Sequence, residues 1–225
     1  MREVVEKKVL SENDRLAAEL RQRYREQNIL CVNFISSPGS GKTALLERTL
    51  GSFAPGTPVA VLTGDLQTDN DARRLMRYGF PVRQIVTGGT CHLDARMVER
   101  HLNELGFRGP GLLLVENVGN LVCPSSYDLG EAAKIVLLSV TEGEDKPLKY
   151  PGIFHRASLM ILTKTDLLPH VDFDPKLTLE NARKIHPEIG YLALSSKTGE
   201  GFDQWLAWLA SLQKRTRQEA TAAIS

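Results

Sequence analysis

The stretch that decides the fold is SSPGSGKT, residues 36–43. It follows an apolar run at 29–35, which has the composition of a buried parallel strand, and it leads into a helical pattern at 42–50. A glycine-rich turn between a strand and a helix is the setting of a phosphate-binding loop. Gly39 and Gly41 let backbone N–H groups approach phosphate oxygens, and the N-terminus of the following helix adds partial positive charge.

The loop also carries the side chains that nucleotide chemistry needs. We expect Lys42 to reach the β- and γ-phosphates and the Thr43 hydroxyl to join the coordination shell of Mg²⁺. The general pattern has glycine at the position of Ser36, but Gly39 and Gly41 line the tight part of the turn. The predicted phosphate-binding residues are Gly39, Ser40, Gly41, Lys42, Thr43 and Ala44.

Strand and helix patterns alternate along the rest of the chain. Further apolar runs lie at 59–63, 84–86, 112–115, 135–140, 159–163 and 191–194, and helical patterns lie at 69–78, 94–105, 175–186 and 202–212. This alternation predicts an α/β fold of the P-loop NTPase type, with a mainly parallel sheet covered by helices on both faces. We expect one such domain at 29–213, an N-terminal helical segment at 1–28 with a helix capped by Ser11, and a frayed tail at 214–225.

Composition narrows the class of protein. The chain has 225 residues, of which 24% are charged and 42% hydrophobic, so a disordered or fibrous protein is excluded. The net charge of +1 gives no electrostatic case for a nucleic-acid partner, and no apolar run is long enough to span a membrane. The charged N-terminus is unlike a secretory signal, and three cysteines suit a reducing, cytoplasmic setting.

Two carboxylates follow strands that should end near the phosphate-binding loop. Asp65 comes just after the run at 59–63, and Glu116 ends the run at 112–115, so both are candidates for the Mg²⁺ site. Gly119 is placed to meet the γ-phosphate, and Asn120 stands where many GTPases carry a water-orienting Gln, which predicts slow intrinsic hydrolysis. The predicted catalytic residues are Lys42, Asp65, Glu116 and Gly119, and the predicted Mg²⁺ ligands are Thr43, Asp65 and Glu116.

The sequence TKTD at 163–166 points to the base that is bound. It resembles the Asn/Thr-Lys-x-Asp element of GTPases, in which a carboxylate such as Asp166 accepts two hydrogen bonds from guanine. Adenine lacks one of these donors, and an unpaired buried polar group costs about 1–3 kcal/mol. The Lys164 stem can lie on the base, and a loop of Ser195, Ser196 and Lys197 resembles the segment that supports guanine. The order of these motifs favours GTP over ATP.

Cysteine and histidine side chains form a candidate metal site. Cys91 and His92 precede a predicted helix, and Cys123 follows Glu116 by seven positions. The spacing is not that of a zinc finger, and by spacing alone two ordinary cysteines and a surface histidine are the simpler interpretation. Both segments should nevertheless lie near the nucleotide edge of the sheet, and thiolate with imidazole suits Zn²⁺ or Ni²⁺. Cys31 lies inside an apolar strand and is expected in the core.

Several strings of the chain are similar to those of the hydrogenase nickel-incorporation GTPases, and they occur in the order that the family has. Besides the loop at 36–43, they are GDLQT at 64–68, TCHL at 90–93, VENVGNLVCP at 115–124 and EGEDKPLKYP at 142–151, so the resemblance covers residues 30–208.

This resemblance implies a cytoplasmic GTPase of the signal-recognition and MinD-like class. It implies a GTP-dependent homodimer that delivers nickel to the hydrogenase large subunit, together with a small zinc-containing metallochaperone partner. It also implies that Cys91, His92 and Cys123 hold the metal in the G domain. Some members carry an N-terminal Cys-rich or His-rich nickel motif, whereas residues 1–27 contain neither Cys nor His. We therefore expect no high-affinity N-terminal nickel site.

Three other functions stay open at the level of sequence. A urease-type nickel GTPase would carry Cys-Pro-His, where this chain has Cys123-Pro124-Ser125. A P-loop small-molecule kinase would need a lid with several arginines, whereas Arg73, Arg74 and Arg77 are more simply a solvated helix face. A GTP-dependent switch protein with incidental cysteines would bind no metal.

Overall fold

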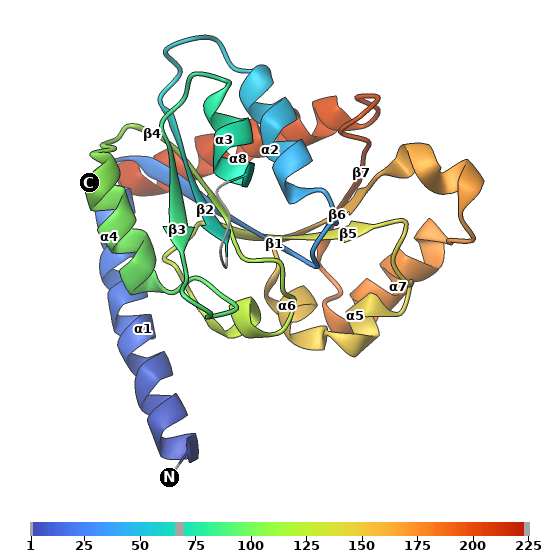
Figure 1. The fold of residues 1–225 in the computed structure, drawn as a ribbon, viewed down its shortest axis with the longest axis horizontal. Coiled ribbons are helices and arrows are strands. Elements are labelled where there is room, and N and C mark those ends of the chain that lie inside the picture. Colours follow the sequence, from blue (N-terminus) through green and yellow to red (C-terminus); the bar gives the residue numbers. More distant parts are fainter. Residues whose placement is uncertain (1, 66–69, 223–225) are drawn as a thin grey trace.

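The computed structural model describes residues 2–65 and 70–222 and contains, within these ranges, one sheet of seven strands (Figure 1). Every neighbouring pair of strands is parallel, and the order across the sheet is β3-β2-β4-β1-β5-β6-β7. The strands are β1 (Ile29–Ser36), β2 (Val59–Asp65), β3 (Val82–Val86), β4 (Gly111–Glu116), β5 (Ala133–Ser139), β6 (Leu159–Thr163) and β7 (Gly190–Ala193).

Helices cover both faces of the sheet (Figure 1). One face carries α2 (Lys42–Gly51), α3 (Asn70–Met76) and α8 (Phe202–Ala222). The other carries α1 (Arg2–Glu26), α4 (Ala95–Leu105), α5 (Lys146–Lys149), α6 (Pro151–Arg156) and α7 (Pro175–Ile185). Two short 3₁₀ turns, η1 (Cys123–Ser126) and η2 (Thr165–His170), complete the described elements. The predicted fold class, a single P-loop NTPase domain, is confirmed.

A separate apolar core lies on each face. Leu46, Leu75 and Trp205 bring α2, α3 and α8 into one cluster with the strands. On the opposite face, Leu20 of α1 and Val98 of α4 belong to a second cluster. Because parallel strands are buried on both faces, nearly every position of the central strands is apolar.

One local prediction, the Ser11 cap, is wrong, and the last helix is longer than the pattern at 202–212 predicted. The first helix begins at Arg2, so Ser11 lies inside it and its Oγ donates to the Lys8 carbonyl instead of capping the helix. Residues 2–10 contain one Arg, two Glu, two Lys and one Leu, which favour helix, beside three Val, and extending a formed helix needs little further free energy. The helix α8 likewise continues to Ala222, through the start of the expected tail at Lys214, in a segment of mostly Gln, Lys, Arg and Ala. Residues 66–69, which include most of the GDLQT string, lie outside the described part of the chain.

The carboxyl ends of the central strands share one edge of the sheet. The phosphate-binding loop follows β1, while Asp65, Glu116 and Thr163 end β2, β4 and β6. Ligands of open α/β sheets bind outside this edge. Among the described helices, none combines the length and the apolarity needed to cross a bilayer.

Candidate nucleotide pocket and metal cluster

The loop between β1 and α2 adopts the backbone that a phosphate-binding loop requires. Gly39 and Gly41 have φ of +75° and +98°, in the left-handed region that side chains with a Cβ rarely enter. Gly41 is the N-cap of α2, so the first free N–H groups of this helix point into the loop. The backbone therefore forms an anion cradle at a helix N-terminus.

Lys42, Thr43 and Glu116 meet at the base of this cradle. The Lys42 ammonium donates to Ser36 Oγ over 2.8 Å, and Thr43 Oγ1 donates to Glu116 Oε1 over 2.7 Å. Glu116 is only 4% exposed, and this burial raises the pKa of its carboxyl to about 7, although Lys42 and Thr43 act in the opposite direction. Burial likewise lowers the pKa of Lys42.

A divalent cation fits this arrangement. Glu116 Oε2 is buried and has no hydrogen-bond partner among the described residues, so one oxygen is left for a ligand. A hydroxyl and a carboxylate are hard oxygen donors of the kind that Mg²⁺ prefers. Thr43 and Glu116 are therefore placed to hold Mg²⁺ together, and Asp65 lines the same cavity.

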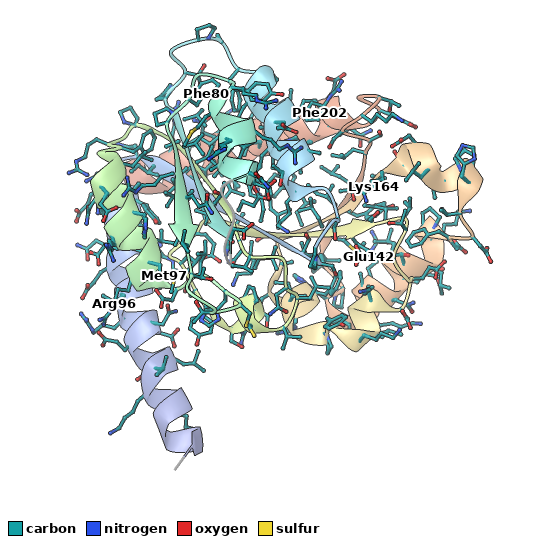
Figure 2. The ribbon with its side chains drawn as sticks, viewed as in Figure 1. Phe80, Arg96, Met97, Glu142, Lys164 and Phe202 are labelled. Carbon is teal, nitrogen blue, oxygen red and sulfur yellow. The ribbon has the colours of Figure 1, made fainter. Side chains whose placement is uncertain are left out.

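A cavity of about 540 Å³ opens above the cradle. Gly119 lies against the loop, since a Cβ added there would be 3.1 Å from Pro38 Cα. Lys164 reaches the cavity from the end of β6 (Figure 2). Of the predicted residues, Gly39, Gly41, Lys42, Thr43, Ala44, Asp65, Glu116, Gly119 and Lys164 line this cavity.

The two predicted base-binding segments contact each other. Asp166 Oδ1 accepts a hydrogen bond of 2.6 Å from Ser195 Oγ, which in turn accepts from the backbone N–H of Lys197. The Ser196 carbonyl accepts from Arg48 Nη1 of α2, so this loop is also tied to the helix of the cradle. These contacts hold the Asp166 carboxylate at a defined place at the nucleotide edge.

The candidate metal ligands converge although they come from two separate loops. The ligand atoms of Cys91, His92 and Cys123 all lie within 4.8 Å of one another. The His92 ring stacks on Tyr127 with ring centroids 3.7 Å apart, and its Nδ1 is buried with no hydrogen-bond partner in the described residues. The neighbouring Cys91 thiol raises the pKa of Cys123, so we expect a bound cation to stabilise the thiolates. Cys31 is buried in the core, as predicted.

Three residues of these sites, Glu142, Arg74 and Tyr127, were not predicted from the sequence as site residues. Glu142 Oε1 accepts from Ser40 Oγ over 2.7 Å and from the Ser139 N–H, so it anchors the phosphate-binding loop to the end of β5 (Figure 2). Arg74 is not merely part of a solvated face, because it lines the cavity and pairs with Glu47. Tyr127 lies three positions after the string at 115–124 and Glu142 begins the string at 142–151, but no local pattern gives their contacts.

The fold and these sites together define a P-loop nucleotide-binding protein with a thiol–imidazole cluster beside its nucleotide cavity. A family model for the CobW/HypB/UreG nucleotide-binding domain matches residues 31–192. The chain therefore belongs to the CobW/HypB/UreG family, and the resemblance found in the sequence is confirmed.

Within this family, the chain is similar to several proteins named HypB. The chain is 52% identical over 216 residues to the hydrogenase maturation factor HypB of Azotobacter vinelandii, covering 96% of this chain and 71% of that protein. It is also 52% identical to HypB of Escherichia coli K12, covering 91% and 71%. The hydrogenase/urease maturation factor HypB of Helicobacter pylori strain 26695 is 43% identical, with coverage of 95% and 89%.

Solved structures agree with this placement. HypB from Helicobacter pylori in complex with nickel superposes with a TM-score of 0.84 at 42% identity, covering 92% of this chain and 97% of that one. HypB from Archaeoglobus fulgidus gives 0.83 at 38% identity, covering 90% and 99%. The signal recognition particle protein of Aeropyrum pernix, at 14% identity and a TM-score of 0.54, shares the fold alone.

Proposed function

We propose that this protein is a metal-regulated GTPase that inserts nickel during maturation of [NiFe]-hydrogenase. The observation that carries the proposal is a direct link between the nucleotide cavity and the metal cluster. Asn117 lines the cavity, and its Oδ1 accepts a 3.1 Å hydrogen bond from the backbone N–H of Leu93. Leu93 is the residue after His92, and its side chain fills the space beside Gly64 at the cavity wall.

In this proposal each group of the cavity has one task. The backbone cradle and Lys42 bind the β- and γ-phosphates, and Thr43, Asp65 and Glu116 hold Mg²⁺, which when bound neutralises charge that develops on the phosphate oxygens. Gly119 lies where a γ-phosphate can contact its backbone. Since Asn120 carries a short amide and donates to the Cys91 carbonyl, hydrolysis is expected to be slow.

Asp166 is proposed to select guanine. In the Asp166→Asn variant a carboxylate oxygen that accepts from guanine becomes an amide that donates, and xanthine carries a carbonyl at the matching position. We expect the preference for GTP over XTP to fall by about 5- to 150-fold, equivalent to about 1–3 kcal/mol. Competition between GTP and XTP for binding measures this change, with the exposed Asp172→Asn variant as the control. Equal discrimination by wild type and Asp166→Asn would show that the base binds elsewhere.

Nickel is proposed to be the cargo of the cluster formed by Cys91, His92 and Cys123. Two thiolates and an imidazole suit Ni²⁺ or Zn²⁺, and three protein ligands leave a position open for transfer. Both ligand loops start near the cavity: Leu93 bonds to Asn117, and Cys123 is seven residues from Glu116. A γ-phosphate that moves these segments would therefore also move metal ligands.

Nucleotide and metal should consequently change each other's affinity. We expect the Kd for Ni²⁺ to differ by about fivefold or more between the GDP state and the state with a non-hydrolysable GTP analogue. By linkage, Ni²⁺ should change the relative affinity for the two nucleotides by the same factor. Nickel titrations of both states and nucleotide titrations with and without Ni²⁺ test this reciprocity. Identical nickel affinities in the two states would refute the coupling.

The proposed partners rest on the family resemblance of the sequence. We propose a GTP-dependent homodimer, a small zinc-containing metallochaperone as the nickel donor and the hydrogenase large subunit as the recipient, all acting in the reducing cytoplasm. A urease-type function is less well supported because Ser125 stands where that branch has histidine, and a kinase is less well supported because Arg74 is engaged with Glu47.

A further inference from the structure

The first helix, α1, is bonded to both loops that carry the candidate metal ligands through the buried side-chain amide of Asn13. Asn13 lies in the middle of α1 and is only 5% exposed. Both ends of its side chain are used, and each end bonds to the backbone of a different ligand-bearing loop. A polar side chain at this depth is retained only where its hydrogen bonds are made.

One end of the amide holds the loop of Cys123. Asn13 Nδ2 donates to the Asp128 carbonyl over 3.0 Å, five residues beyond Cys123. The Asp128 carboxylate accepts from Arg21, also on α1, at 2.6 and 2.7 Å. The preceding residue, Tyr127, is the one that stacks on His92. Anchoring Asp128 therefore also places the ring that covers a metal ligand.

The other end holds the loop of Cys91 and His92. Asn13 Oδ1 accepts a 2.9 Å hydrogen bond from the Ala95 N–H, three residues beyond His92. Ala95 is the first residue of α4, so its N–H has no partner within that helix. The Asp94 side chain caps α4 through the Met97 N–H and leaves the Ala95 donor to Asn13. The start of α4 is thus attached to α1.

We infer that Asn13 is a positioning residue of the metal site. It joins the two loops whose side chains supply the ligands and so sets their separation before the metal binds. Without this bridge the two loops would keep fewer of the contacts that fix their separation, so the metal would have to order them further, and that ordering costs conformational entropy that weakens binding. The inference rests on the proposed function only in taking Cys91, His92 and Cys123 as the metal ligands.

Nickel affinity of the full-length, GDP-bound protein tests this inference. Ni²⁺ alone is titrated in competition with a chelator, and binding is followed by the thiolate-to-nickel charge-transfer absorption. We expect Asn13→Ala to raise the Kd for Ni²⁺ by about 10- to 100-fold, the usual effect of removing a partner that orients metal ligands. The affinity of the metal-free protein for GDP should stay within about twofold of wild type, because Asn13 lies outside the nucleotide cavity.

The matched control is Leu16→Ala, which removes packing from the same helix but leaves both bonds of Asn13. It should lower the Tm without changing the nickel Kd or the absorption band. Asn13→Leu retains the side-chain volume and loses both bonds, so it provides the comparison if Asn13→Ala does not fold. A nickel Kd equal to wild type in the folded Asn13 variant would overturn the inference and leave Asn13 with a structural role. Nickel binding that survives in the Cys91→Ala/Cys123→Ala variant would overturn both this inference and the proposed metal site.

Discussion

The Lys42→Ala variant is expected to bind nucleotide far more weakly and to lose all measurable GTP hydrolysis. Lys42 is 7% exposed, its ammonium group donates to Ser36 Oγ at the base of the cradle, and in the proposed function it pairs with the β- and γ-phosphates. Removing one partner of a buried, hydrogen-bonded charge pair costs about 2–5 kcal/mol, which corresponds to a loss of affinity of roughly 30-fold to several thousandfold. Titration with a fluorescent GDP analogue and release of inorganic phosphate measure the two effects.

The control for this experiment is Lys176→Ala, which removes an exposed lysine from α7, away from the cavity. It should bind and hydrolyse GTP as wild type does. Thermal unfolding of both variants establishes that they are folded. Hydrolysis at the wild-type rate in Lys42→Ala would show that the cradle between β1 and α2 is not the site of GTP turnover.

The Cys91→Ala/Cys123→Ala variant is expected to lose stoichiometric nickel and zinc while it still binds GTP. It removes two of the three ligand atoms that lie within 4.8 Å of one another and leaves the His92 imidazole alone. Removing a residue that only orients a metal ligand typically weakens metal binding by about 10- to 100-fold. Removing the ligands themselves should weaken it further, so we expect the metal Kd to rise more than about 100-fold. Metal content after gel filtration and the thiolate-to-nickel absorption band report this change.

Cys31→Ala is the matched thiol control, because Cys31 is buried in β1 away from the cluster. It should lower stability slightly and leave the metal content unchanged. Retention of one equivalent of Ni²⁺ by the double variant would mean that the chain binds nickel through other residues. The proposed function would then keep its GTPase part and lose its cargo site.

Most elements of the fold could be predicted because their signals are local. The alternation of apolar runs and helical stretches identified all seven strands, and the glycine-rich turn at 36–43 identified the cradle and its helix. Helix ends were less predictable: Ser11 has the residue type of a cap, but the helix continues through it to Arg2. Capping residues are favoured at helix ends without being excluded from helix interiors, and neighbouring helix formers decide between the two.

The candidate nucleotide site could be predicted where its residues lie at the ends of strands. Glu116 was assigned to Mg²⁺ from its position after an apolar run, and in the structure it bonds to Thr43. That contact exists because β4 pairs with β1, with Phe34 opposite Glu116 in the register. The partner of a strand is decided by the packing of the entire sheet, so the string around Glu116 alone does not contain it. The contacts of Glu142 with Ser40 and of Arg74 with Glu47 depend on the same arrangement.

The sequence by itself determined which chemical groups this protein has and which local backbone presents them. It specified the cradle at 36–43, the acids after the strands, the TKTD element and the presence of two thiols and an imidazole. Only the tertiary structure decided that Cys91 and His92 meet Cys123, and that Asn13 reaches across 115 positions to Asp128 and 82 to Ala95. Local spacing fixes hydrogen bonds and side-chain periodicity within one element. Contacts between distant segments instead depend on the strand order and on the helices packed against the sheet, which form only when the whole core is buried.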